Sequence, residues 1–134
     1  MKTGVTFVMS AVILGTSVLL GAHEDLWRRV EHFDPGMRVK VTVEGAPPTD
    51  RYFVQLNDTV LVLLNLSAPD VPKRQLLNMA IDNPAWIAGT SKTTYRDNNL
   101  RIGPEGVFVK DKKVAELNQV VEWIPRGKVT AIQK

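Results

Sequence analysis

Residues 37–66, MRVKVTVEGAPPTDRYFVQLNDTVLVLLNL, decide the fold of this chain because they contain three short stretches with the pattern of strands. Residues 37–43 alternate valine with charged or polar side chains, which predicts a strand with one buried face. A glycine- and proline-rich turn follows, then a second strand over residues 51–56. After a tight Asn-Asp turn, residues 59–66 are almost wholly apolar. We therefore predict that this third strand is central and covered on both faces.

A short helix is expected before the three strands, over residues 24–33. Leu26, Trp27, Val30 and Phe33 recur there at helical spacing. The Asp-Pro-Gly sequence that follows predicts the end of this helix.

After the third strand, the pattern of residues 73–81 predicts a second helix, capped by Asp70. Residues 83–99 are polar and irregular and are expected to form a loop over the barrel. Residues 107–110 and 113–117 predict a hairpin. The chain closes with strands over residues 120–124 and 129–132, separated by a Pro-Arg-Gly break.

These elements predict a mainly β fold: a small, strongly bent antiparallel barrel with an N-terminal helix. We expect residues 23–134 to form one domain, with a helix and loop insertion at about residues 67–106.

The chain resembles the Sm-like barrels in two sequence motifs. Their first motif matches the pattern of residues 39–64, with a glycine turn after the first strand and Asn57 where the family usually carries an aspartate. Residues 124–127, Ile-Pro-Arg-Gly, are similar to the second motif, including its Arg-Gly pair. In the order of these features the chain looks closest to small exported bacterial barrel proteins of unknown function. The resemblance implies a fold and a compartment, with no activity attached.

The departures from the family pattern concern its RNA pocket. In this alignment the RNA-contacting asparagine corresponds to Leu61, the glycine of the second strand to Arg51, and the residue after Arg-Gly is Lys128. We therefore expect no specific nucleic acid partner.

An uncharged segment, residues 3–22, follows Lys2 and ends in Leu-Gly-Ala. A basic start, an apolar stretch and small residues before the first charges are typical of a bacterial signal peptide over residues 1–22. Cleavage after Ala22 would place the protein in the periplasm or outside the cell. The alternative is an uncleaved anchor in the inner membrane, since about 20 uncharged residues can span a bilayer.

The composition limits the chemistry. The chain has no cysteine, which excludes disulfides and thiol chemistry, and a net charge of only +3, which does not indicate nucleic acid binding. Its two histidines, His23 and His32, are nine positions apart, about 13 Å along a helix. If cleavage made His23 the first residue, its imidazole and amino group could bind Cu(II), but a second histidine would be needed. His32 is too far along the helix to complete such a copper site. We expect no catalytic residue, cofactor or metal site.

Six residues are candidates for a contact surface. Trp86 and Tyr95 stand in the polar segment where a core role is not required, and three lysines crowd the predicted hairpin tip. The six are Trp86, Tyr95, Arg126, Lys110, Lys112 and Lys113.

Two classes of function remain. The first is a non-enzymatic binding or assembly module that contacts another protein, or another copy of itself, through edge strands and the segment around Trp86. The second is a small hydrolase or ligand-binding enzyme of the cell envelope that uses the turn carboxylates Asp50, Asp58 and Glu105. The scarcity of histidine and the absence of a catalytic motif favour the first class.

Overall fold

The computed structural model describes residues 24–134, which fall into two compact units that divide after His32. In the first unit residues 24–30 are helical, and the main chain then turns. The expected helix over residues 24–33 is therefore confirmed in its first part and ends earlier than predicted. The expected signal peptide, residues 1–22, and His23 lie outside the described residues.

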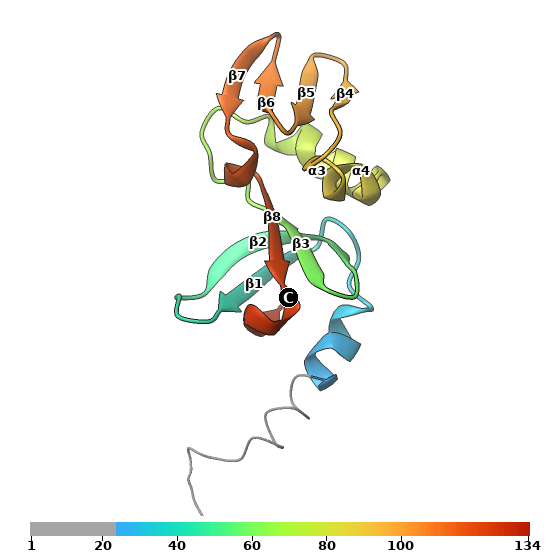
Figure 1. Cartoon of the computed structure of the whole chain (residues 1–134), viewed down its shortest axis with the longest axis vertical. Helices are drawn as coiled ribbons and strands as arrows, with labels where there is room; N and C mark the ends of the chain where they lie inside the picture. The colour runs from blue at the N-terminus through green and yellow to red at the C-terminus, as the bar shows by residue number, and fades with distance from the viewer. Residues whose placement is uncertain (1–23) are drawn as a thin grey trace, which may run out of the picture. The chain divides into compact units, whose positions relative to one another are not determined.

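The second unit, Phe33–Lys134, is mainly β and contains two antiparallel sheets (Figure 1). The first sheet has the strand order β8-β3-β2-β1-β9. Its strands are β1 (Arg38–Val43), β2 (Thr49–Leu56), β3 (Val60–Leu64), β8 (Val121–Pro125) and β9 (Val129–Gln133). The second sheet has the order β4-β5-β6-β7. Its strands are β4 (Tyr95–Asp97), β5 (Leu100–Gly103), β6 (Gly106–Val109) and β7 (Lys112–Ala115).

The first three strands confirm the pattern of residues 37–66. In β1 the alternating valines Val39 and Val41 are buried while Arg38 and Lys40 are exposed. Strand β3 lies between β8 and β2, and its last four residues are buried, so it is central and covered on both faces.

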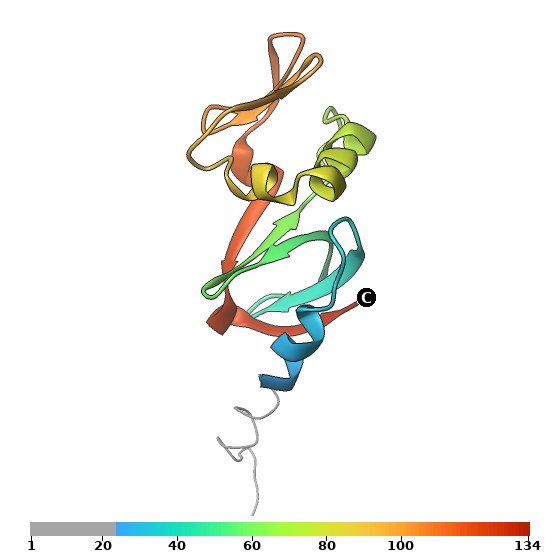
Figure 2. The same cartoon turned by 90° about the vertical axis from the view of Figure 1, so that its right-hand side faces the viewer.

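The five-stranded sheet is bent, because its two outer strands are neighbours in the sequence. Only the 3-10 turn η2 (Arg126–Lys128) separates β8 from β9. Such a turn advances roughly 2 Å per residue, whereas the outer strands of a flat five-stranded sheet would lie roughly 19 Å apart. The sheet must therefore curl until its two edges meet at η2, as the views in Figures 1 and 2 show.

The expected single barrel is corrected to two sheets, with no closed barrel among the described residues. Strand β8 pairs only with β3, and β9 pairs only with β1, so no ladder joins the two edges. One physical reason is Pro125 at the end of β8, which has no N–H to donate to a further strand.

The segment between β3 and β8 holds more structure than the expected helix and loop insertion. It contains α3 (Lys73–Asp82), α4 (Pro84–Ala88), the whole second sheet and the 3-10 turn η1 (Leu117–Gln119). The predicted irregular loop over residues 83–99 is wrong, because α4 and β4 form there. The predicted hairpin of residues 107–117 is confirmed as β6 and β7, but it belongs to the second sheet rather than to a barrel.

Helix α3 confirms the predicted helix at residues 73–81 but not its cap. The residue before the helix is Pro72, and no side chain caps the first turn, so the expected cap by Asp70 is wrong. Both α3 and α4 lie between the two sheets in Figures 1 and 2. One apolar cluster joins these layers: Val62 and Leu64 of β3, Leu76 and Ile87 of the helices, and Ile102 of the second sheet belong to it.

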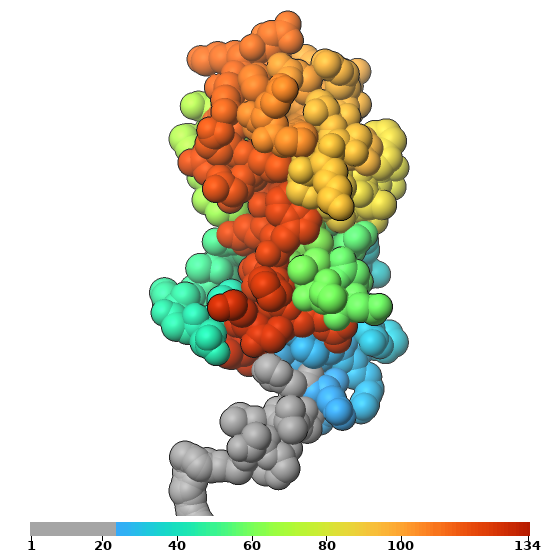
Figure 3. Space-filling view, in the orientation of Figure 1, coloured from blue at the N-terminus to red at the C-terminus, as the bar shows by residue number. Residues whose placement is uncertain are grey.

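Figure 3 shows the face on which the red C-terminal segment, which includes β8, runs from the second sheet to the five-stranded sheet. Among the described residues no helix is both long and apolar enough to cross a membrane.

Candidate functional site

Two of the predicted contact residues, Trp86 of α4 and Tyr95 of β4, stack with their rings nearly parallel. Their ring centroids are 5.1 Å apart and their planes differ by 14°. Trp86 remains 40% exposed, and only one other large apolar residue of the described chain, Ile81, is as exposed. Sequence reasoning selected both residues but could not show that they form one surface, which we call the aromatic platform (Trp86 and Tyr95).

The aromatic platform is held by contacts on the buried side of α4. Pro84 occupies the first turn of this short helix, where its missing N–H is not needed. Trp123 of β8 donates its Nε1–H to the carbonyl oxygen of Ala88 over 3.0 Å, which ties α4 to the five-stranded sheet. The Tyr95 hydroxyl lies so close to Gly89 that a Cβ there would be 3.0 Å from it. These contacts fix the exposed ring of Trp86 on a rigid base.

The three predicted lysines lie together on the β6–β7 hairpin, as the sequence predicts. Lys110 and Asp111 form its two-residue turn and both have positive φ, 51° and 66°. Lys113 is paired with Glu116, with 2.6 Å between Nζ and Oε1, so part of the positive charge at this tip is neutralised.

Arg126 has a different position, on η2 of the five-stranded sheet. Its Nη1 donates to the carbonyl oxygens of Asn57 and Asp58 over 3.2 and 3.4 Å. The guanidinium thus links η2 to the β2–β3 turn. The six predicted residues therefore occupy three places: the aromatic platform, the lysine hairpin and the η2 turn.

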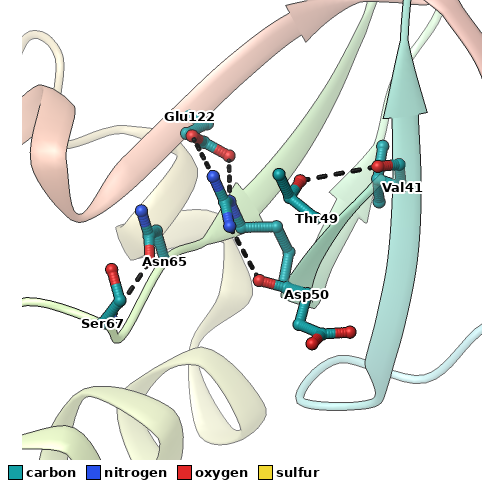
Figure 4. Close-up of polar contacts among 7 residues, drawn as sticks. Val41, Thr49, Asp50, Asn65, Ser67 and Glu122 are labelled. Carbon is teal, nitrogen blue, oxygen red and sulfur yellow. Dashed lines mark hydrogen bonds and ion pairs between the residues drawn. The ribbon is translucent and has the colours of Figure 1, made fainter. Parts of the chain in front are cut away.

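Sequence reasoning missed a groove of about 550 Å³ between the five-stranded sheet and α3. Most of its lining residues have polar side chains, among them three cations and one carboxylate. The lining residues are Arg38, Asp50, Tyr52, Asn65, Leu66, Ser67, Lys73, Arg74, Leu77 and Asn78. We call this hollow the α3 groove. Figure 4 shows Asp50, Asn65 and Ser67, which come to it from β2 and from the chain after β3.

A second hollow, of about 800 Å³, lies on the other side of the start of α3. It is lined by residues 72–75 and 78 and by the β4–β5 turn, residues 97–99. Lys73, Arg74 and Asn78 line both hollows. The only sequence signal of this arrangement was the adjacent pair of basic residues at the start of the predicted helix, which by itself indicates a solvated helix face.

The carboxylates considered for catalysis lie in a strand and in turns that belong to two different sheets. Asp50 of β2 is 3.6 Å from Arg38, Asp58 lies in the β2–β3 turn, and Glu105 in the β5–β6 turn is 3.4 Å from Arg101. In residues 24–134 no group of three or more His, Asp or Glu side chains is placed to hold a metal ion.

Comparison with family models, with curated proteins and with solved structures finds no match to this chain.

Proposed function

We propose that this protein is a non-enzymatic binding module that contacts another polypeptide, either a different protein or a second copy of itself, through the aromatic platform. The observation that carries the proposal is the exposed ring of Trp86 stacked on Tyr95. Tryptophan and tyrosine are enriched in the energetically dominant part of protein interfaces.

Rigidity supports the proposal. An aromatic side chain that is already fixed loses little conformational entropy when a partner covers it. Here the ring of Trp86 is fixed by Tyr95, and α4 is fixed by the bond from Trp123 to Ala88. Tryptophan is highly buried on average, whereas Trp86 leaves 40% of its surface exposed.

A photo-crosslinking residue in place of the exposed Ala85, next to Trp86, tests the proposal in cells. We expect a crosslinked product that is absent when the crosslinker replaces the exposed Lys128. The captured chain is then purified, and its affinity for the wild-type protein is compared with that for Trp86→Ala and Trp86→Phe. Loss of at least about tenfold with alanine and partial retention with phenylalanine are expected. Equal affinity of all three proteins would contradict the proposal.

The alternative function, a small hydrolase using turn carboxylates, has no specific geometry in its favour. Asp50 and Glu105 are each close to an arginine of their own sheet. Pairs of this kind are common on protein surfaces and stabilise modestly.

We also propose that the five-stranded sheet is an interrupted relative of the Sm-like barrels, and that the protein acts outside the cytoplasm. The first proposal is supported by the positions of the two motifs, since residues 39–64 cover most of β1, β2 and β3 and residues 124–127 join β8 to η2. The second is supported by the apolar segment of residues 3–22.

A further inference from the structure

The α3 groove places positive charge on both of its walls. Arg38 comes from β1, and Lys73 and Arg74 come from α3, while Asp50 is the only carboxylate in the lining. The groove therefore carries a net charge of +2, three cations less one carboxylate. Its volume of about 550 Å³ lies within the range of ligand-binding pockets, roughly 300–1,000 Å³.

Little of this charge is used inside the protein. Within residues 24–134 the Arg74 side chain makes no hydrogen bond or ion pair, and the Lys73 side chain makes one bond, over 3.2 Å, to the carbonyl oxygen of Ala68. Arg38 has only a long contact of 3.6 Å with Asp50, and both side chains are mostly exposed. The planar guanidinium of Arg74 is thus available to take a carboxylate through two parallel hydrogen bonds.

The remaining lining is suited to a polypeptide. Tyr52, Leu66 and Leu77 supply apolar surface, while Asn65 and Asn78 supply amide groups. The Asn65 oxygen accepts the Ser67 N–H, and its NH₂ group has no partner among the described residues (Figure 4). The exposed carboxylate of Asp50 can accept a hydrogen bond, which a peptide backbone N–H donates and a phosphodiester cannot. The mixture is also unlike the continuous basic track that nucleic acid requires.

We propose that the α3 groove binds an acidic segment of another polypeptide. A Glu or Asp carboxylate of the segment pairs with Arg74 and Lys73, and a neighbouring apolar side chain packs on Tyr52 and Leu77. This inference rests on the proposed function of a protein-binding module and adds a second contact with a defined partner chemistry. Trp86 and Tyr95 line neither hollow, so the two sites can be tested separately.

The test is fluorescence anisotropy with a short labelled peptide in which Glu alternates with Leu, compared with the same peptide carrying Gln at every Glu. At physiological salt the Glu peptide should bind the wild-type protein, and the Gln peptide should bind at least about tenfold more weakly. Arg74→Ala should lower the affinity for the Glu peptide at least about tenfold, because it removes both hydrogen bonds of the bidentate pair with the carboxylate. Alanine is the best helix former, so this variant should keep its fold.

The matched control is Arg96→Ala, which removes an exposed arginine of β4 that lines neither hollow and should leave peptide affinity unchanged. Trp86→Ala should also bind the Glu peptide normally. Equal binding of the Glu and Gln peptides, equal loss in the Arg74 and Arg96 variants, or tighter binding of a uridine-rich RNA of similar length would each overturn the groove proposal. A crosslinked partner that still depends on Trp86 would then leave the proposed function standing.

Discussion

Arg51 of β2 and Glu122 of β8 form a two-point ion pair across the intervening strand β3. The Nε–Oε1 distance is 2.8 Å and the Nη2–Oε2 distance is 3.3 Å, and the two side chains are only 17% and 26% exposed. The dashed lines from Glu122 in Figure 4 mark these bonds. The pair links the strand that returns from the second sheet to the strands that begin the first one.

Glu122→Gln should therefore destabilise the protein by about 1–3 kcal/mol, because it removes the charge that a half-buried guanidinium faces. Urea unfolding followed by tryptophan fluorescence measures the change. The control is Glu105→Gln, since Glu105 is 77% exposed and 3.4 Å from Arg101, and it should cost less than about 0.5 kcal/mol. Equal losses of unfolding free energy in the two variants would contradict a larger stabilising contribution from the Arg51–Glu122 pair.

Two glycines should differ sharply when replaced by alanine. Gly106 has a φ of +130°, and a Cβ there would lie 2.9 Å from the carbonyl oxygen of Ala115. A Cβ added at Gly127 would meet no atom within 4 Å beyond its own neighbours in the chain. Gly106→Ala should lower the unfolding free energy by at least about 1 kcal/mol, whereas Gly127→Ala should be neutral or slightly stabilising. Comparable melting temperatures would contradict the described backbone at Gly106.

The stability of the protein can be increased by changing two residues of the β6–β7 turn. Lys110 and Asp111 adopt the two positive φ values of a type I′ turn, which Asn-Gly adopts at lower cost. Replacing the pair by Asn-Gly should stabilise the protein by about 0.5–1 kcal/mol. Thermal unfolding measures the gain, and Lys112→Asn, outside the turn, serves as the control. A loss of stability would mean that the loop has another conformation.

The export proposal predicts where the mature chain begins. N-terminal sequencing of protein recovered from the cell envelope should start at His23 or within a residue or two of it, because small residues precede this position. Protein with an intact Met1 in the membrane fraction would contradict cleavage and support the uncleaved membrane anchor.

RNA binding is expected to be weak and insensitive to base sequence. In the proposed alignment with the Sm-like family, Leu61 corresponds to the RNA-contacting asparagine, and it is fully buried. Arg126 is bonded to the β2–β3 turn. A fluorescent uridine-rich oligonucleotide should therefore lose its affinity steeply as salt rises, since only phosphate attraction remains. A sequence-selective complex at physiological salt that weakens in Arg126→Ala would contradict this prediction.

The sequence by itself determined those elements whose signal is local. Valine alternation in β1, the apolar run of β3 and the helical spacing of α3 each depend on the side chains of one segment and the period of its own backbone. Helix α4 and strand β4 were missed because five and three residues are too few to show a period.

Only the tertiary structure decided which strands share a sheet, because pairing depends on partners far away in the chain. The β6–β7 hairpin was visible as a hairpin, but its place in a second sheet was not, since either sheet offers an edge of the same backbone chemistry. The same reason applies to the sites. Trp86 reaches Tyr95 because the connection between β3 and β8 folds on itself, and Arg38 and Arg74 line one groove because α3 of this connection lies beside the first sheet.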